Sequence, residues 1–324
     1  MPSDPTRRRL AVLRRRAHLV RAIREFFESL GYLEVHTPAR VVCPGLEPHL
    51  VALPAGPDRW LRTSPELHMK RLLAAGADRI WQLAPCWRGD ESGPWHLTEF
   101  TLLEWYRAGA SLEQIADEAV ALIRHVAAAA GTARFGMCAL DREPERLTVR
   151  QAVLRQTGLD LAALRDRDAL ADGLARVGVR SAPGEDWDTL FFRLFVERIE
   201  PALGRERITL LSEYPASQAA LARIRHDPDW PVALRTEIYA GGVELANAFD
   251  ELTDAAEQRA RHEADRQARA RAGREVPPLD ERFLAALEAG MPPAAGIALG
   301  VDRLVALALG LPDVREAVPF PDEV

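Results

Sequence analysis

The first clear pattern in the chain is an amphipathic helix. In HLVRAIREFFESLGYLEV the apolar residues Leu19, Ile23 and Phe27 recur at helical spacing, and Gly31 marks the expected C-terminal end. The β-branched and aromatic character of the next residues predicts a short strand, Tyr32–Val35, before Pro38.

Short strands with helices between them follow this first helix. Strand patterns continue to position 106, interrupted by one helix at Pro65–Ala75, and return at ITLLSEYP and ALRTEIYAGGVELANAFDEL. Further helices are predicted at Leu112–Ala130 and at Thr253–Gly273, the latter with opposite charges four residues apart and a solvated face. Residues 147–203 form a more helical block without a chemical cluster, which we interpret as an inserted subdomain. Because strands and helices do not alternate strictly, the pattern favours an α+β fold with an antiparallel sheet.

Composition narrows the class of protein. The 324 residues carry a formal net charge of −6, 48% are hydrophobic, and no apolar run reaches membrane-spanning length. The N-terminus lacks the apolar core of a signal peptide, and three widely spaced cysteines do not suggest zinc or disulfides, so we expect a cytoplasmic protein. Two arginine triplets, Arg7–Arg9 and Arg14–Arg16, can either touch an acidic partner or form a solvated helix face.

The segment TEFTLLEWY carries charge within a strand pattern. A period of two places Phe100, Leu102, Glu104 and Tyr106 on one face. A carboxylate and a phenol on one face can orient the ammonium and carboxylate groups of a small substrate. The alternative is an outer face that is left to solvent.

The segment EIYAGGVEL predicts a hairpin closed by Gly241-Gly242, because glycine permits the positive φ of a two-residue turn. In that register Tyr239 opposes Glu244, and Glu237 lies diagonally across on the same face. Two such carboxylates repel each other unless a divalent cation bridges them, and Mg²⁺ prefers oxygen ligands. The alternative is that both are simply exposed.

Strict alternation would put Asn247, Phe249 and Glu251 on the opposite face from Glu244. If these residues share a pocket, the strand must contain a bulge near Ala246-Asn247.

Two arginines are candidates for phosphate contacts. Arg88 ends a strand before the turn-rich GDESGP loop, and Arg303 lies in the first turn of the last helix, where amide groups favour an anion. A lone arginine is more often a surface cation, so this interpretation depends on the combination.

That combination resembles the catalytic core of class II aminoacyl-tRNA synthetases. FFESLGYLEVHTP is similar to the first motif of these enzymes, CWRGDES…WHLTEFTLLEWY to the second and GIALGVDRL to the third. TSPELHMKRLL and GGVELANAFDEL resemble the lysine branch. The resemblance implies an antiparallel sheet flanked by helices, and a homodimer formed through the first motif.

Within this branch the chain resembles a truncated family. The first motif starts near residue 19, which leaves no room for the anticodon-binding domain of a lysyl-tRNA synthetase, so tRNA is not the expected acceptor. The elongation factor P–(R)-β-lysine ligases share this architecture and attach β-lysine to one lysine of the translation factor. The resemblance implies ATP as a substrate, Mg²⁺, (R)-β-lysine and elongation factor P as partners, with a basic segment at 1–18 and a catalytic domain at 19–324. Ala298 stands where lysyl-tRNA synthetases usually have glycine, and its methyl would disfavour α-lysine.

The resemblance also implies roles for individual residues. Glu66 and Glu251 would bind ammonium groups, Arg88 and Arg303 would be catalytic, and Mg²⁺ would lie on Glu237 and Glu244. The residues implied in amino-acid binding are Ser64, Pro65, Glu66, Glu104, Tyr106, Asn247, Phe249, Glu251 and Ala298. The residues implied in ATP binding are Arg88, Gly89, Asp90, His96, Leu97, Glu244, Leu245, Gly300 and Arg303.

The chain departs from the family pattern at three positions. Leu97 replaces an asparagine that contacts ATP, Asp90 is a shorter acid than the usual glutamate, and Ala248 replaces a glycine. Two alternatives to the ligase stay open. One is a lysine-activating enzyme with tRNA or a small molecule as acceptor, and the other is a non-catalytic regulatory paralogue that only binds an amino acid.

Overall fold

The computed structural model describes residues 5–91 and 93–321. Residues 1–4 of the expected basic segment and 322–324 of the expected catalytic domain lie outside the described residues, as does the side chain of Arg8. The helices are α1 (Pro5–Ser29), α2 (Glu66–Ala74), α3 (Leu112–Ala130), α4 (Val149–Thr157), α5 (Arg167–Arg176), α6 (Trp187–Leu194), α7 (Ala255–Arg271), α8 (Glu281–Gly290) and α9 (Val301–Leu309). The strands are β1 (Leu33–Glu34), β2 (Arg40–Val41), β3 (Trp60–Leu61), β4 (Arg79–Trp87), β5 (Glu99–Ala108), β6 (Arg134–Phe135), β7 (Cys138–Ala139), β8 (Glu145–Thr148), β9 (Thr209–Pro215), β10 (Ile224–Arg225), β11 (Val232–Ala240), β12 (Val243–Asp250) and β13 (Ala294–Gly300).

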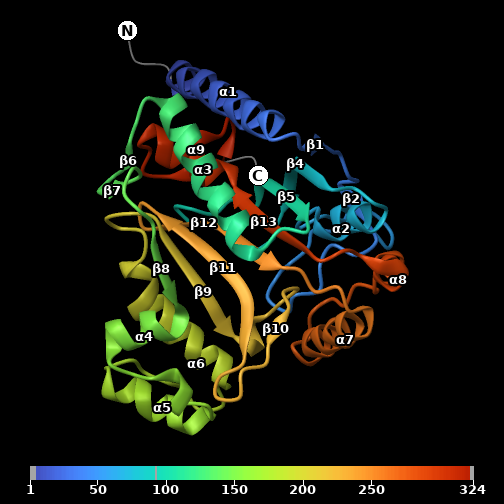
Figure 1. Ribbon diagram of the computed structural model, residues 1–324, viewed down its shortest axis with the longest axis vertical. Helices are drawn as coiled ribbons and strands as arrows, with labels where there is room; N and C mark the ends of the chain where they lie inside the picture. Colours follow the sequence, from blue (N-terminus) through green and yellow to red (C-terminus); the bar gives the residue numbers. More distant parts are fainter. Residues whose placement is uncertain (1–4, 92, 322–324) are drawn as a thin grey trace.

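One large sheet organises the described part of the chain (Figure 1). Its strands run in the order β1-β4-β5-β13-β12-β11-β9-β8, with β10 also paired to β11. The central pairs from β4 to β9 are antiparallel, whereas β1–β4 and β8–β9 at the two ends are parallel. The predicted α+β class with a mainly antiparallel sheet is therefore confirmed.

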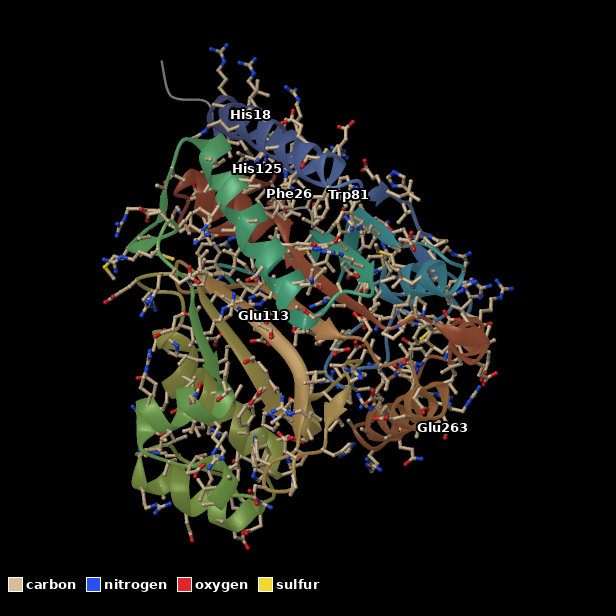
Figure 2. The ribbon with its side chains drawn as sticks, in the orientation of Figure 1. His18, Phe26, Trp81, Glu113, His125 and Glu263 are labelled. Carbon is tan, nitrogen blue, oxygen red and sulfur yellow. The ribbon has the colours of Figure 1, made fainter. Side chains whose placement is uncertain are left out.

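Helices α1, α3 and α9 cover one face of the sheet with the main apolar core. Phe27 of α1 stacks on Trp81 of β4 at 4.8 Å and meets Trp105 of β5 edge-on. Figure 2 shows Phe26 of α1 beside His125 of α3, whose ring centroids are 5.6 Å apart. Because odd positions of β5 face these helices, its even positions are presented to the opposite side of the sheet.

The predicted helices and strands match the structure closely, and local signals explain their limits. Helix α3 begins after Ser111, whose hydroxyl accepts the backbone N–H of Gln114, and ends at Gly131 with a φ of 77°. The predicted block at 147–203 holds α4, α5 and α6, which surround a second apolar cluster at the lower left of Figure 1.

The N-terminal helix differs from the prediction. It is continuous from Pro5 to Ser29, so the arginine triplets belong to the same helix as the first motif. Arg16 is only 16% exposed and lies 2.6 Å from the buried carboxylate of Asp302 in α9. Asp302 also accepts the backbone N–H of Thr101 in β5 at 2.7 Å. Both predictions for the arginine triplets, a partner contact or a solvated face, are wrong for Arg16. Its side chain instead joins α1 to α9 and β5.

Helix α7 also departs from the prediction of a solvated helix. It buries Gln258, His262 and Arg269, and the guanidinium of Arg269 donates to the backbone carbonyls of Glu47 and Leu50 at 2.9 Å each. The helix therefore holds the loop that precedes β3. A buried arginine within a charged sequence gives no apolar signal, which is why the pattern concealed it.

Among the described residues, no helix combines the length and apolarity that crossing a bilayer requires.

We expect Arg16→Met to lower the free energy of unfolding by about 3 kcal/mol, because it leaves the buried charge of Asp302 without its partner. Urea unfolding followed by circular dichroism measures the change. Arg15→Met is the matched control, since Arg15 is exposed and makes only a 3.3 Å contact to the carbonyl of Ala130. Equal effects of both substitutions would contradict the role assigned to Arg16.

Candidate active site

The predicted face of β5 lies away from the main core and carries a buried carboxylate. Glu104 is 1% exposed, and its oxygens accept the hydroxyls of Ser64 at 2.6 Å and Tyr106 at 2.8 Å. Burial raises the pKa of Glu104 to about 7, helped by the charge of Glu66. The alternative of a solvent-exposed face is therefore wrong for this strand.

The β11–β12 hairpin forms as predicted. Gly241 and Gly242 both have positive φ, 65° and 78°, and Tyr239 pairs with Glu244. The register then shifts by one residue at Leu245, so that Glu237 pairs with Asn247. The predicted bulge is confirmed one residue before Ala246.

The bulge has a direct consequence for the site. Leu245 turns into the apolar core, whereas Glu244 and Asn247 share the face of Glu237 and Tyr239. Strand β12 can therefore contribute from both sides of the bulge to one surface.

Strand β13 forms the floor between these two groups. Ala298 pairs with both Glu104 and Asn247, so its methyl lies on the same face as they do. Gly296 pairs with Tyr106 and Phe249. A Cβ on Gly296 would come within 2.2 Å of the Tyr106 ring and 2.4 Å of a carboxylate oxygen of Glu251, so only glycine fits here.

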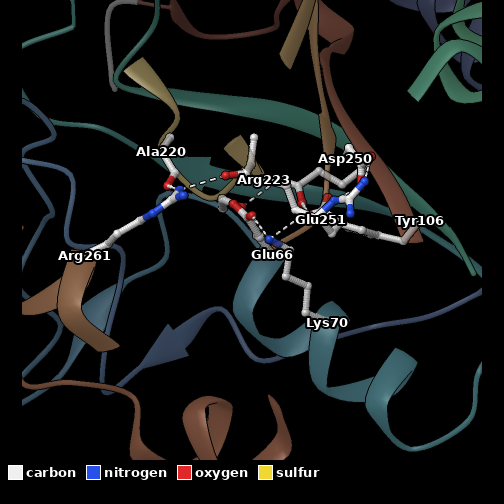
Figure 3. Close-up of polar contacts among 11 residues, drawn as sticks. Glu66, Lys70, Tyr106, Ala220, Arg223, Asp250, Glu251 and Arg261 are labelled. Carbon is white, nitrogen blue, oxygen red and sulfur yellow. Dashed lines mark hydrogen bonds and ion pairs between the residues drawn. The ribbon is translucent and has the colours of Figure 1, made fainter. Parts of the chain in front are cut away.

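A buried ammonium joins two carboxylates at one end of this face. Lys70 of α2 is 0% exposed, and its Nζ lies 2.5 Å from both Glu66 Oε1 and Glu251 Oε2 (Figure 3). Burial alone would lower the pKa of Lys70, but Glu251 and Glu66 outweigh burial and raise it. Burial raises the pKa of Glu251, against the opposing effect of Lys70.

Lys70 was missed at the sequence level. Its spacing of four residues from Glu66 on a helix was a readable signal for an ion pair, but the long-range contact with Glu251 was not.

A small pocket opens next to this cluster. Ser64 and Glu66 line it, together with Glu47, His262 and Asp265. Burial raises the pKa of Asp265 to about 6 and lowers that of His262 to about 4. Acidic side chains therefore line this pocket, which lies beside the end of the face that carries Glu66.

Glu237 lies at the other end and has three donors around it. It accepts the hydroxyls of Tyr214 and Tyr239 and is paired with Arg235. The guanidinium of Arg235 lies 4.5 Å from the Tyr214 ring and 5.9 Å from the ring of Phe249, and it donates to Asn247 at 3.1 Å. Sequence reasoning missed Tyr214 and Arg235, since both lie outside the recognised motifs.

Glu244 completes this acidic end. Burial and the charge of Glu237 raise the pKa of Glu244 to about 7. Within the described residues, no group of three His, Cys, Asp or Glu residues is placed to hold a metal ion. Two neighbouring carboxylates nevertheless suit Mg²⁺, which usually takes one or two protein carboxylates and obtains its other ligands from water and substrate phosphates.

Two arginines, both predicted to contact phosphate, lie near the middle of this surface. Arg303 begins α9 and donates to the backbone carbonyls of Trp95 and Glu244 at 2.9 Å each. Arg88 lies 5.2 Å from the centre of the Phe100 ring and only loosely contacts Glu91, at 3.6 Å. Burial lowers the pKa of the intervening His96, and the charges of Arg303 and Arg88 lower it further.

The remaining predicted ATP residues are placed by backbone geometry. The N–H of Gly89 donates to Val51 at 2.7 Å, and Asp90 has a φ of 61° in the turn that follows. Gly300 immediately precedes α9, with Leu102 as its strand partner. Leu97 is 6% exposed, so the side chain that replaces the family's asparagine packs as an apolar residue.

Comparisons with known proteins agree with this geometry. Residues 6–324 match the family described as tRNA synthetases class II (D, K and N). The chain is 42% identical to the elongation factor P–(R)-β-lysine ligase of Proteus mirabilis over 96% of its length and 95% of that protein. Proteins of the same name from Edwardsiella ictaluri and Hamiltonella defensa are 42% and 38% identical, over 98% and 99% of the chain and 96% and 97% of those proteins. The chain belongs to the class II tRNA synthetase family and, within it, to the group of elongation factor P–(R)-β-lysine ligases.

Proposed function

We propose that the protein activates (R)-β-lysine with ATP and transfers it to the ε-amine of one lysine of elongation factor P. The observation that carries the proposal is the polar face of the sheet, which has buried carboxylates at its amino-acid end and two arginines with little acidic pairing at its centre. The relatives that carry this activity in their name align over nearly the whole chain.

In this proposal the acidic end binds the amino acid. Glu66 and Glu251 receive its two ammonium groups, while Glu104 is held by Ser64 and Tyr106 and adds negative charge. Pro65 opens the helix that carries Glu66, and Asn247 and Phe249 wall the site. The methyl of Ala298 narrows the floor and disfavours α-lysine.

Adenylate formation needs no side-chain nucleophile, because the substrate carboxylate is already ionised. This carboxylate attacks the α-phosphorus of ATP, and pyrophosphate leaves. Arg88 and Arg303 hold the reacting groups and neutralise charge that develops in the transition state. His96 and the backbone around Gly89, Asp90, Leu245 and Gly300 position the nucleotide.

Glu244 and Glu237 would hold Mg²⁺. When bound, the ion would neutralise phosphate charge. Glu237 is fixed by Tyr214, Tyr239 and Arg235, so it is oriented before any ligand arrives.

In the second step the neutral ε-amine of the acceptor lysine attacks the carbonyl carbon of the adenylate. An amide forms and AMP leaves. We further propose a cytoplasmic homodimer in which residues 19–324 form the catalytic domain and 147–203 form a helical insertion. Residues 5–18 extend the first helix of this domain.

We expect that the purified protein, given ATP, Mg²⁺ and (R)-β-lysine, adds one β-lysyl unit to elongation factor P. Intact-mass measurement of the factor detects the addition. Arg88→Ala should lower the rate by at least about 100-fold, because it removes a cation from the transition state. Arg150→Ala, which removes an exposed arginine paired with Asp160 in the helical block, should leave it unchanged.

Other outcomes of this experiment discriminate between the alternatives. An unchanged mass together with ATP–pyrophosphate exchange would mean activation with a different acceptor. Absence of exchange with every lysine isomer would favour a binding protein without catalytic activity.

Gly296→Ala should raise the KM for (R)-β-lysine by about 100-fold, because the new methyl displaces the Tyr106 ring and the Glu251 carboxylate. The KM for ATP should change little. Steady-state exchange kinetics give both constants, and thermal unfolding verifies that the variant is folded. An equal rise in both constants would contradict a local effect on the amino-acid end.

The KM for (R)-β-lysine should rise as the pH falls through about 7, because Glu104 then takes up a proton and attracts the ammonium groups less. The folded pKa is raised above the ordinary value, so the ionised form prevails only above that pH. We expect a change of about tenfold between pH 8 and pH 6. In Glu104→Gln the dependence centred near pH 7 should disappear, and only that of Glu251, whose pKa burial raises to about 8, should remain. An unchanged profile would assign the titration near pH 7 to another group.

A further inference from the structure

Lys70 lies inside the proposed amino-acid site, but the proposed mechanism gives it no role. It is 0% exposed, it projects from α2 toward the sheet, and its ammonium lies 2.5 Å from one oxygen of Glu66 and 2.5 Å from one oxygen of Glu251 (Figure 3). A cation so completely removed from water is retained only where its partners compensate for the lost hydration.

The contacts of Lys70 divide each carboxylate into two oxygens with different surroundings. Glu66 uses Oε1 and Glu251 uses Oε2 for Lys70. Glu251 is 1% exposed, yet its Oε1 is buried without a hydrogen-bond partner. A buried acceptor without a donor is costly, so this oxygen points to a ligand that supplies one.

The third carboxylate of the cluster does not need a ligand. Both oxygens of Glu104 already accept hydroxyl groups, from Ser64 and Tyr106. Two oxygens therefore remain for ammonium groups, one on Glu66 and one on Glu251.

The charges lead to the same number. The cluster contains three carboxylates, on Glu66, Glu104 and Glu251, and one ammonium, on Lys70. Carboxylates therefore outnumber the cation. A ligand with two ammonium groups compensates them more completely than a ligand with one.

We propose that Lys70 is a positioning residue that sets the geometry of the amino-acid site, so that the site selects a ligand with two ammonium groups. This inference rests on the proposed function and deepens it. Lys70 holds Glu66 and Glu251 in place, and each carboxylate presents its second oxygen to the ligand.

The groups that face this cluster come from four elements. They are Glu66 and Lys70 of α2, Glu104 and Tyr106 of β5, Glu251 after β12, and His262 of α7, whose pKa is lowered by burial and by Lys70. Tyr106 and His262 are neutral at pH 8, where the test is made.

Lys70→Met removes the cation that fixes Glu66 and Glu251. In exchange assays at pH 8, the KM for (R)-β-lysine should rise about 100-fold, with a smaller change in kcat and in the KM for ATP, because the two carboxylates that meet the ligand are no longer held. Lys70→Arg, which keeps the charge, should restore the KM toward the wild-type value.

Arg124→Met is the matched control for a purely structural loss. Arg124 is a partly buried cation on the opposite side of the sheet that donates to the carbonyls of Leu140 and Arg142. It should lower stability without changing the KM for (R)-β-lysine. A KM for (R)-β-lysine that is the same in Lys70→Met as in the wild type would overturn the proposal.

A second variant covers the case in which Lys70→Met does not fold. Lys70→Met combined with Glu251→Gln removes the ammonium together with one of its carboxylates, so no buried charge is left unpaired. This variant should prefer (R)-β-lysine over a β-amino acid without a side-chain amine less strongly than Glu251→Gln alone does, because Glu66 has also lost the cation that fixes it. An equal preference in the two variants would overturn the proposal. A wild type that binds neither (R)-β-lysine nor α-lysine would instead refute the proposed function.

Discussion

Burial of negative charge on one face of the sheet is the constraint that the rest of the site depends on. Glu104 and Glu251 are 1% exposed and Glu237 is 5% exposed, although a carboxylate that loses its water is strongly destabilised. Each carboxylate is compensated in a different way. Glu237 accepts two phenol groups and pairs with an arginine, and Glu104 accepts two hydroxyl groups. Among the described residues, Glu251 has only the ammonium of Lys70 as a partner for its side chain. The carboxylate with the least complete compensation is the one expected to meet a ligand.

The sheet can carry this charge because its two faces are sharply separated. Trp105 and its neighbours pack under α1, α3 and α9, so the buried carboxylates lie on the other side of the sheet. A period of two would still have divided the residues of β12 between the faces. The single extra residue at Leu245 corrects this, because Glu244 and Asn247 then point the same way on either side of it.

The sequence predicts what depends on short-range pattern. The limits of α3, the Gly241-Gly242 turn, the face of Glu104 and the need for a bulge in β12 follow from spacing within about ten residues. Arg16 and Lys70 do not follow, because their partners Asp302 and Glu251 are distant in sequence. Arg235 was missed for another reason: its partner Glu237 is only two residues away, but Arg235 itself lies outside the recognised motifs. A charged side chain looks the same in a sequence whether it faces water or crosses the interior.

The partners of each cation separate structural charges from available ones. Arg235 and Lys70 are neutralised by Glu237 and by Glu66 and Glu251 respectively, so they add no net attraction for an anion. Arg303 is instead fixed by two neutral backbone carbonyls, and its nearest carboxylate, Glu244, is 3.7 Å away. Carbonyls orient a guanidinium without cancelling its charge. Arg88 and Arg303, which follow β4 and β13, therefore supply positive charge between the two acidic groups. In the proposed function, this separation keeps the ammonium and phosphate ligands at different places on one continuous face.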